Sequence, residues 1–249
     1  MKKWQKINLI AFLLMVFATV FLVYIIGKSN FSTPFSKPWH LLPTDHEDSL
    51  STLYKDSYKI LGKSPLRATL LDSSRINVFI LVDAWGVPAE EGVLAEDFKT
   101  FENITHKFAL HHRLTNYTSH AEHAEFRNNM NSLFLFGGDS LQFNRTEYIP
   151  EIGFQQVLYC TNCPNDTIIG KISSILAETE HPQFIAWTAL ASTVGSHNEI
   201  RQVLGQIADL AKKHPDVRFV IQGTHRPVLC GPEIRNSYKA HWVPVAILN

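Results

Sequence analysis

Two groups of residues that could carry chemistry lie about 35 residues apart in the sequence. The first is Asp83, which ends the apolar run 76–83, and the second is the hydroxyl-rich segment 116–122, Asn-Tyr-Thr-Ser-His-Ala-Glu. The apolar run is short, rich in β-branched residues and followed by Gly86 and Pro88, so it predicts a fully buried strand. Open α/β sheets bind ligands at the carboxyl edge of their strands. We therefore expect Asp83 to lie at a ligand-binding edge.

The hydroxyl-rich segment has two compatible interpretations. Ser119 and Glu122 have the Ser-x-x-Glu spacing of a capping box, which predicts the start of a helix. A hydroxyl at a helix N-terminus also lies beside free backbone N–H groups and the positive end of the helix dipole, where an anionic ester would bind. Ser119 can therefore cap the helix while Thr118 faces a substrate.

Composition limits the class of protein. The chain has 249 residues, of which 45% are hydrophobic and 18% charged, with a formal net charge of zero. This length and composition allow one sizeable hydrophobic core. The charge balance gives no electrostatic basis for binding nucleic acid, whose binders usually carry a basic face.

The N-terminal residues predict a membrane anchor. Residues 7–26 are almost wholly apolar and contain no charged residue, which matches the roughly 20 residues that span a bilayer. Three lysines precede the stretch, so we expect the N-terminus to stay inside and the rest of the chain to lie outside. A cleaved signal peptide is the alternative, but the stretch is long for one and no clear cleavage site follows. The expected organisation is a stub and anchor at 1–27, a tether and lead-in helix at 28–73, and a domain at 74–249.

The remaining pattern predicts alternating strands and helices. Expected core strands are 76–82, 183–190, 217–222 and 243–248, a further strand is expected within 107–116, and expected helices are 46–62, 119–134, 167–178 and 198–213. This alternation predicts an α/β fold with a mostly parallel sheet and helices on both faces, preceded by one transmembrane helix.

The three cysteines predict one local crosslink. Cys160 and Cys163 are three positions apart, so in an oxidising exterior compartment we expect them to form a disulfide. Cys230 is distant and is either free or a partner of one of the other two. A redox-active pair is not expected, because the flanking residues do not predict a strand-to-helix turn.

The order of these features resembles the alkaline-phosphatase superfamily over roughly residues 74–249. The resemblance rests on the strand ending at Asp83, on Thr-Ser-His-Ala-Glu at 118–122, on Asn-Ser-Leu at 131–133, and on a later strand followed by His225 and then Val-Pro. Within the superfamily, these motifs are most similar to those of membrane-anchored lipoteichoic-acid synthases and phosphoethanolamine transferases, with sulfatases as broader relatives. Each motif is weak alone, and their order carries the resemblance.

The resemblance implies roles for three residues. Asp83 corresponds to a metal ligand, Thr118 to the nucleophile, which also touches the metal, and His225 to a metal-binding histidine. A divalent cation such as zinc or manganese would activate the hydroxyl and neutralise the phosphoryl oxygens. The first step would then give a phospho-threonine enzyme, which water or an acceptor hydroxyl resolves.

One position departs from the family pattern. Thr224 stands where the family has an aspartate, and threonine is a poor ligand for a divalent ion. His120 and His123, three positions apart on one helical face, are candidates to replace the missing acid. The alternative is a degenerate, non-catalytic protein that serves as a binding or assembly module in envelope polymer synthesis.

Two further residues are candidates for substrate contacts. His197 follows the strand 183–190, where the family often has a histidine that contacts phosphate or substrate, and we expect it to be catalytic. The alternative interpretation is a helix start, because Ser196 and Glu199 repeat the capping-box spacing. Arg226 could bind a phosphate in a bidentate manner, or it could be a surface arginine.

The resemblance also implies a cellular setting. It implies a single-pass inner-membrane protein of a bacterium, with the N-terminus inside and the domain periplasmic or extracellular. The implied substrates are phospho- or sulfo-esters of an envelope lipid or polysaccharide, processed by transfer or hydrolysis.

Overall fold

The computed structural model describes residues 14–21, 50–61, 71–72, 74–113, 117–126, 132–138, 152–161, 163–181, 183–190, 196–228 and 230–249. The chain divides into two compact units, Met1–Glu47 and Asp48–Asn249. In the first unit, residues 14–21 are helical and their apolar side chains are exposed. The rest of the predicted membrane span lies outside the described residues. Within the described ranges, no helix has the length and apolar character needed to cross a bilayer.

The second unit is built on one mixed sheet. Its described strands are β1 (Lys59–Leu61), β2 (Asn77–Val82), β3 (His106–His112), β4 (Ser132–Gly138), β5 (Gln156–Thr161), β6 (Phe184–Ala189), β7 (Arg218–Gly223) and β8 (Trp242–Leu248). They are ordered β1-β3-β8-β7-β2-β6-β4-β5. Strand β8 runs antiparallel to both of its neighbours, and the other neighbouring pairs are parallel. The prediction of a mostly parallel α/β sheet is therefore confirmed, with β8 as the reversed strand.

Strand β2 lies at the centre of the sheet and is buried on both faces. Val78, Ile80 and Val82 enter one apolar core, whereas Phe79 and Leu81 enter a second core on the opposite face. This division follows from the alternation of side chains along a strand. Because helices bury both faces, the sequence of β2 is a continuous apolar run.

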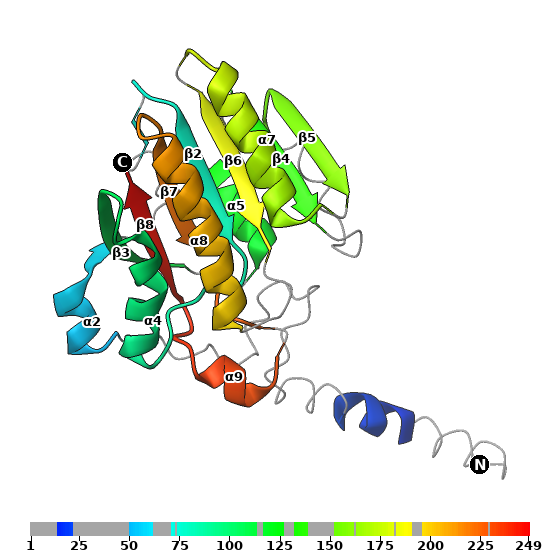
Figure 1. The fold of residues 1–249 in the computed structure, drawn as a ribbon. Coiled ribbons are helices and arrows are strands. Elements are labelled where there is room, and N and C mark those ends of the chain that lie inside the picture. The colour runs from blue at the N-terminus through cyan, green and yellow to red at the C-terminus, as the bar shows by residue number, and fades with distance from the viewer. Residues whose placement is uncertain are drawn as a thin grey trace, which may run out of the picture. The chain divides into compact units, whose positions relative to one another are not determined.

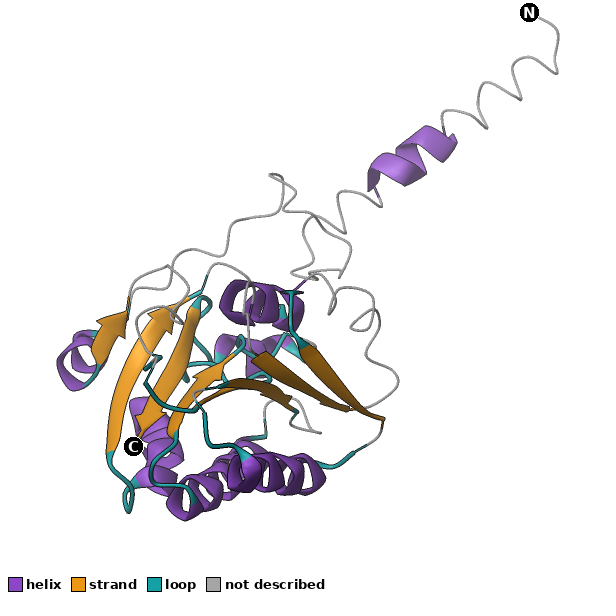
Figure 2. Cartoon of the chain, turned by 90° about the horizontal axis from the view of Figure 1, so that it is seen from above, coloured by secondary structure: helices purple, strands orange, loops and turns teal. Residues whose placement is uncertain are grey.

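Helices lie on both sides of the sheet (Figures 1 and 2). Buried side chains of α4 (Glu91–Phe98), α7 (Asn165–Glu178) and α8 (His197–Lys213) belong to the first core, whereas those of α5 (Thr118–Phe126) belong to the second. The short elements α2 (Thr52–Ser57), η1 (Lys99–Phe101) and α9 (Pro232–Asn236) complete the described structure. The predicted coverage of both faces is confirmed.

Two predicted helices were wrong in part. The helix expected over 119–134 ends at Phe126, and Ser132–Gly138 forms β4 instead, because the run Leu-Phe-Leu-Phe has the strand preference of large apolar residues and pairs with β5 and β6. The lead-in helix expected within 46–62 covers only Thr52–Ser57. It is followed by β1, whose Lys59–Leu61 pair with β3.

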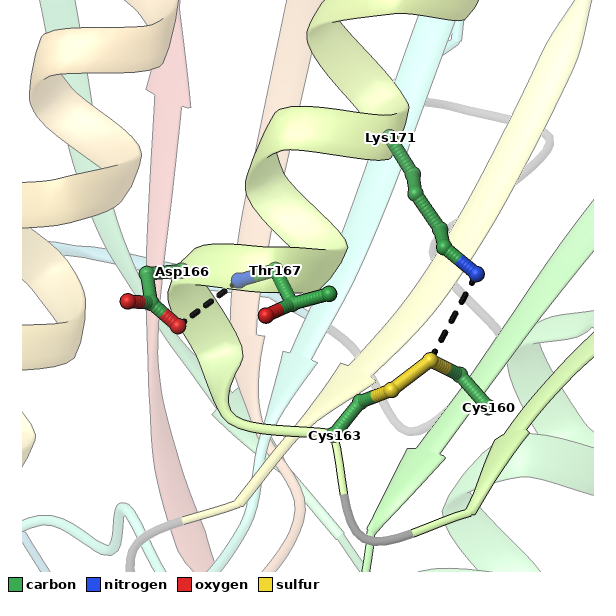
Figure 3. The surroundings of a disulfide bond; sticks show 5 residues. All are labelled: Cys160, Cys163, Asp166, Thr167 and Lys171. Carbon is green, nitrogen blue, oxygen red and sulfur yellow. Dashed lines mark hydrogen bonds between the residues drawn. A yellow bond between two sulfur atoms is a disulfide. The ribbon is translucent and has the colours of Figure 1, made fainter.

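The disulfide lies at a strand-to-helix turn, contrary to the sequence-based expectation. Strand β5 ends at Thr161 and α7 begins at Asn165. Cys160 and Cys163 form the predicted local disulfide across this turn, with Cα atoms 5.5 Å apart, and Cys230 is free (Figure 3). The turn was missed because β5 was not predicted as a strand.

Candidate functional site

The carboxyl edge of the sheet brings together residues from two neighbouring strands. Strands β2 and β7 are parallel and pair Val82 with Gly223, so the residues that follow, Asp83 and Thr224, are adjacent. The Thr224 N–H donates to the Val82 carbonyl at 3.0 Å, and the Asp83 N–H donates to the Ala189 carbonyl of β6 at 2.8 Å. These backbone hydrogen bonds fix the start of both loops.

Two glycines allow the loop after β2 to cross the segment after β7. A Cβ atom on Gly223 would lie 1.8 Å from the Trp85 carbonyl oxygen, and one on Gly86 would lie 2.6 Å from the Arg226 Cα. Ala84, directly after Asp83, has a φ of 54°, which is uncommon for a residue with a side chain. The two segments are therefore packed backbone against backbone, with Asp83 held at their crossing.

Four side chains meet at this crossing and form what we call the edge cluster: Asp83, Thr118, Thr224 and His225. The Thr118 hydroxyl donates to Asp83 Oδ1. The Thr224 hydroxyl also donates to Asp83 Oδ1, at 3.1 Å, and accepts the Ala84 N–H at 3.1 Å. His225 Nε2 lies 3.1 Å from Thr118 Oγ1 and 3.6 Å from Asp83 Oδ1.

The backbone fixes the orientation of the His225 ring. Nδ1 lies 2.6 Å from the Arg226 carbonyl oxygen. A carbonyl oxygen can only accept, so Nδ1 carries the proton of the neutral ring and Nε2 presents a lone pair toward Thr118. The His225 side chain is 8% exposed and that of Asp83 is 24% exposed, so the cluster opens to solvent at the carboxylate.

Buried polar contacts hold the helix that begins at Thr118. Glu122 and Glu125 of α5 are both fully buried against the sheet. Glu122 accepts from the Thr188 hydroxyl at 2.6 Å, and Glu125 accepts from Arg113 at 3.2 Å and from Gln222 at 3.3 Å. Residues of β6, of β7 and of the position directly after β3 therefore hold α5 in place. Gln222 belongs to β7, the strand that leads to His225.

Glu125 and its partners were missed by sequence reasoning. The available signal was its spacing from Ala121 and Glu122, which places it on the same helix face. Burial lowers the pKa of the Arg113 guanidinium, and the nearby Glu125 carboxylate opposes this shift. A buried charge pair of this kind specifies where the helix sits, because breaking it would leave an uncompensated charge.

His197, expected to be catalytic, belongs to a different group of side chains. This helix cluster consists of Trp85, Asp97, His197, Arg201 and Tyr238. His197 Nδ1 donates to Asp97 Oδ2 at 3.2 Å, and its Nε2 accepts from the Tyr238 hydroxyl at 2.7 Å. Asp97 also accepts from Trp85 at 3.2 Å and from Arg201 at 2.9 Å.

The helix-start interpretation of this segment is confirmed by a cap. The Ser196 hydroxyl accepts the Glu199 N–H at 3.4 Å at the N-terminus of α8. His197 is then the first helical residue, and its ring is held by α4 and by the segment before β8. The structure thus places it with Asp97 and Tyr238, and not with the edge cluster.

The other candidate residues lie on α5 and directly after His225. His120 lies at the surface with its ring edge-on to the Tyr117 ring, and partial desolvation of the ring, followed by the charge of nearby His123, lowers its pKa. Both histidines are on α5, facing away from the buried Glu122 and Glu125. Arg226 is only 7% exposed, so it is not a surface arginine.

Two of the three donor-atom distances in the edge cluster are compatible with one divalent cation, whereas Thr118 Oγ1 and Asp83 Oδ1 are hydrogen-bonded to each other and would have to separate to bind the same ion. Ligands of one tetrahedral zinc lie about 3.3 Å apart, because zinc–ligand bonds measure about 2.0–2.2 Å. His225 Nε2 lies 3.1 Å from Thr118 Oγ1 and 3.6 Å from Asp83 Oδ1, within this range, and its Nδ1 is oriented by a carbonyl, as in metal-binding histidines. No group of three His, Cys, Asp or Glu side chains in the described part of the chain could hold a metal ion. The edge cluster contains two residues of these types, and the donors that it offers are the carboxylate of Asp83, the imidazole of His225 and the hydroxyl of Thr118.

Comparison with solved structures confirms the fold that the resemblance implies. The lipoteichoic acid synthase LtaP from Listeria monocytogenes matches 71% of this chain, over 65% of its own, with a TM-score of 0.52 and 8% sequence identity. A protein of the alkaline phosphatase superfamily from Vibrio parahaemolyticus matches 72% of this chain, over 61% of its own, with a TM-score of 0.52 and 12% identity. The chain covers less than two thirds of either structure. No protein-family model and no curated protein sequence matches this sequence.

Proposed function

We propose that the protein is a phospho- or sulfo-ester transferase or hydrolase that uses Thr118 as its nucleophile. One observation carries the proposal: the Thr118 hydroxyl lies at the start of α5 between the Asp83 carboxylate and the lone pair of His225 Nε2. A nucleophile, a base within hydrogen-bond reach and a group that orients the base are the parts required for covalent catalysis. The fold, which is shared with a lipoteichoic acid synthase, is compatible with this proposal.

In the first step, the Thr118 oxygen attacks the phosphorus or sulfur of the ester. For the attack, the hydroxyl turns its proton from Asp83 Oδ1 to His225 Nε2, which accepts it, and Asp83, 3.6 Å away, stabilises the imidazolium that results. The ester bond breaks, the departing alkoxide takes a proton from solvent, and the imidazolium of His225 returns its proton to solvent before the second step. The product is a covalent phospho- or sulfo-threonine, whose anionic oxygens face the N–H groups of the first turn of α5.

In the second step, an acceptor hydroxyl or water attacks the covalent intermediate. His225 withdraws the proton from the attacking oxygen, and Thr118 is released with its hydroxyl restored. An alcohol acceptor gives transfer and water gives hydrolysis. The carboxylate of Asp83, whose side chain is 24% exposed, marks the side from which the acceptor would enter.

A divalent cation is part of the proposal. Zinc or manganese held by Asp83, Thr118 and His225 would occupy the lone pair of His225 Nε2, so the metal, in place of the free imidazole, would activate the Thr118 hydroxyl and supply positive charge to the oxygens of the ester. With one carboxylate in the cluster and a hydroxyl at Thr224, we expect weaker retention of the metal than in a site with two acids.

The proposed setting is the outer side of a bacterial membrane. The apolar stretch 7–26 with its preceding lysines supports a single anchor with the N-terminus inside. The disulfide between Cys160 and Cys163 supports an oxidising compartment for the domain. The proposed substrates are accordingly esters of an envelope lipid or polysaccharide.

Turnover of an activated aryl phosphate and an aryl sulfate by the full chain, with zinc or manganese added, tests the proposal. We expect Thr118→Ala to lower turnover about 10³-fold or more, because it removes the attacking oxygen. The matched control is Ser119→Ala, which removes the neighbouring hydroxyl and should keep turnover close to wild type. Equal turnover by wild type and Thr118→Ala would contradict the proposal.

A binding or assembly module is the second candidate, and Thr224 favours it. This residue is fully buried, and its hydroxyl donates a hydrogen bond to Asp83 Oδ1. The family resemblance implies a second acid at this position. A module would show no turnover of either ester and no rise in melting temperature when zinc or manganese is titrated. An enzyme of the proposed kind would show both.

A further inference from the structure

The Cys160–Cys163 disulfide has the surroundings of an exchangeable pair. It spans the turn between β5 and α7, and both cysteines are only partly buried (Figure 3). Pro164 follows the second cysteine directly and precedes the first turn of α7. A thiol in solution can therefore reach the pair without unfolding of the sheet.

A lysine makes the two sulfurs different from each other. The Lys171 ammonium, from the second turn of α7, points back along the helix and donates to Cys160 Sγ at 3.4 Å (Figure 3). When a disulfide is cleaved, one sulfur departs as a thiolate, and a nearby cation stabilises that thiolate. Cys160 is therefore the sulfur that departs, and Cys163 is the sulfur that is attacked.

The short span of the crosslink argues against a mainly structural role. The two cysteines are three positions apart, so the bond closes a very small loop. In the chain-entropy account, stabilisation by a disulfide increases with the length of the loop that it closes. Strand β5 is also held by its pairing with β4, which runs from Leu133–Gln156 to Gly138–Thr161 without the bond.

We propose that Cys160 and Cys163 form a redox-exchange site that accepts a dithiol reductant. A thiolate of the dithiol attacks Cys163 Sγ, the bond between the two cysteines breaks, and Cys160 departs as a thiolate beside Lys171. The second thiol of the reductant then attacks the mixed disulfide and releases Cys163. Two electrons and two protons pass from the dithiol, which becomes a disulfide, to the cysteine pair. The proposal is independent of the ester chemistry at Thr118.

The test is the rate of reduction by dithiothreitol in the folded full chain. The background carries Cys230→Ser, so that only the proposed pair can contribute free thiols. Thiols are trapped with a maleimide at intervals and counted by intact mass, while circular dichroism confirms that the protein stays folded. Lys171→Met keeps the length of the side chain and removes the charge. Lys212→Met, at an exposed lysine of α8 that contacts Asp209, is the matched control.

We expect reduction within the folded protein and a rate about threefold to tenfold lower in Lys171→Met, because the departing thiolate loses its cation. Lys212→Met and Lys171→Arg should reduce at nearly the wild-type rate. A pair that stays oxidised until the protein unfolds would overturn the proposal. Equal rates in wild type and Lys171→Met would overturn it as well.

Discussion

The edge cluster and the helix cluster contain the same three chemical groups in different surroundings. Each has an aspartate, a histidine and a hydroxyl, with the histidine within 3.6 Å of the carboxylate and 3.1 Å of the hydroxyl oxygen. In the helix cluster, the Asp97 side chain is fully buried and ion-paired with Arg201, and both ring nitrogens of His197 are hydrogen-bonded. In the edge cluster, the Asp83 side chain is 24% exposed.

The comparison of the two clusters shows that residue type alone does not make a reactive site. The helix cluster neutralises its carboxylate and encloses its hydroxyl, so it ties α4, α8 and the segment before β8 together. The edge cluster offers a hydroxyl at a helix start and a histidine lone pair, both beside a carboxylate that solvent can reach. We therefore expect substitutions in the helix cluster to change stability, and those in the edge cluster to change turnover.

The largest expected effect separates the two aspartates. Asp97→Ala should lower the free energy of unfolding by about 3–5 kcal/mol, because it leaves Arg201 and the Trp85 N–H without their buried partner. Asp83→Ala should change it by about 1 kcal/mol or less, since its partners are two hydroxyls and a histidine. Urea titration followed by circular dichroism measures both.

The same pair of variants should show the opposite order in turnover. Asp83→Ala should abolish turnover of an aryl ester, whereas folded Asp97→Ala should retain most of it. If Asp83→Ala proved as destabilising as Asp97→Ala, the edge cluster would be a structural cluster too, and the contrast between them would fail.

A smaller effect is expected from restoring the acid at the edge cluster. In Thr224→Asp, a second carboxylate replaces a hydroxyl that lies 3.1 Å from Asp83 Oδ1, so the two charges repel each other in the presence of a chelator. A metal held by both acids should stabilise the variant by about 2.7 kcal/mol at a hundredfold excess over its Kd. Thermal melts with and without zinc measure the shift.

Thr224→Val is the matched control for this variant, because it keeps the shape of threonine and adds no charge. It should show no gain in metal response. A Thr224→Asp protein whose melting temperature is insensitive to zinc and manganese would indicate that the edge cluster is not a metal site.

The smallest effect concerns Tyr238 in the helix cluster. Burial, followed by the charges of Asp97 and Cys230, raises the pKa of Tyr238 from 10.0 to about 12. The folded protein therefore keeps a proton that the unfolded chain loses near pH 10, so this contribution to stability is complete below pH 10 and is lost as the pH rises toward 12.

Tyr238→Phe should cost about 1 kcal/mol at neutral pH through the lost hydrogen bond to His197. It should also flatten the fall in stability between pH 10 and 12. Denaturation at a series of pH values measures the slope. An unchanged alkaline slope in Tyr238→Phe would show that another group is responsible.

The central strands and the edge residues were predictable from sequence because their signals are local. Asp83 ends a continuous apolar run, and His225 follows another, so parallel pairing of the two strands brings both to one edge. The capping-box signal predicted a helix in the right place but put its start two residues too late, because α5 begins at Thr118 and Ser119 lies inside the helix instead of capping it. What these residues do chemically stays a prediction.

The missed features depend on contacts between distant segments. Nothing near Glu125 indicates that Arg113 and Gln222 will meet it, since Arg113 directly follows β3 and Gln222 lies in β7. The placement of His197 depends in the same way on Asp97, which is 100 residues away in sequence. Strand β5, at the edge of the sheet, was missed because polar and apolar residues alternate little along it. Because the strand was missed, the strand-to-helix turn that carries the disulfide was missed as well.

The most direct measurement of the central claim is the mass of the protein during turnover. The full chain is mixed with an aryl phosphate or aryl sulfate, quenched in acid and digested, and the peptide that contains Thr118 is analysed by mass spectrometry. The account predicts the added mass of one phosphoryl or sulfuryl group on Thr118 in wild type and in Ser119→Ala, and none in Thr118→Val. Turnover without any modified Thr118, or modification of another residue, would contradict it.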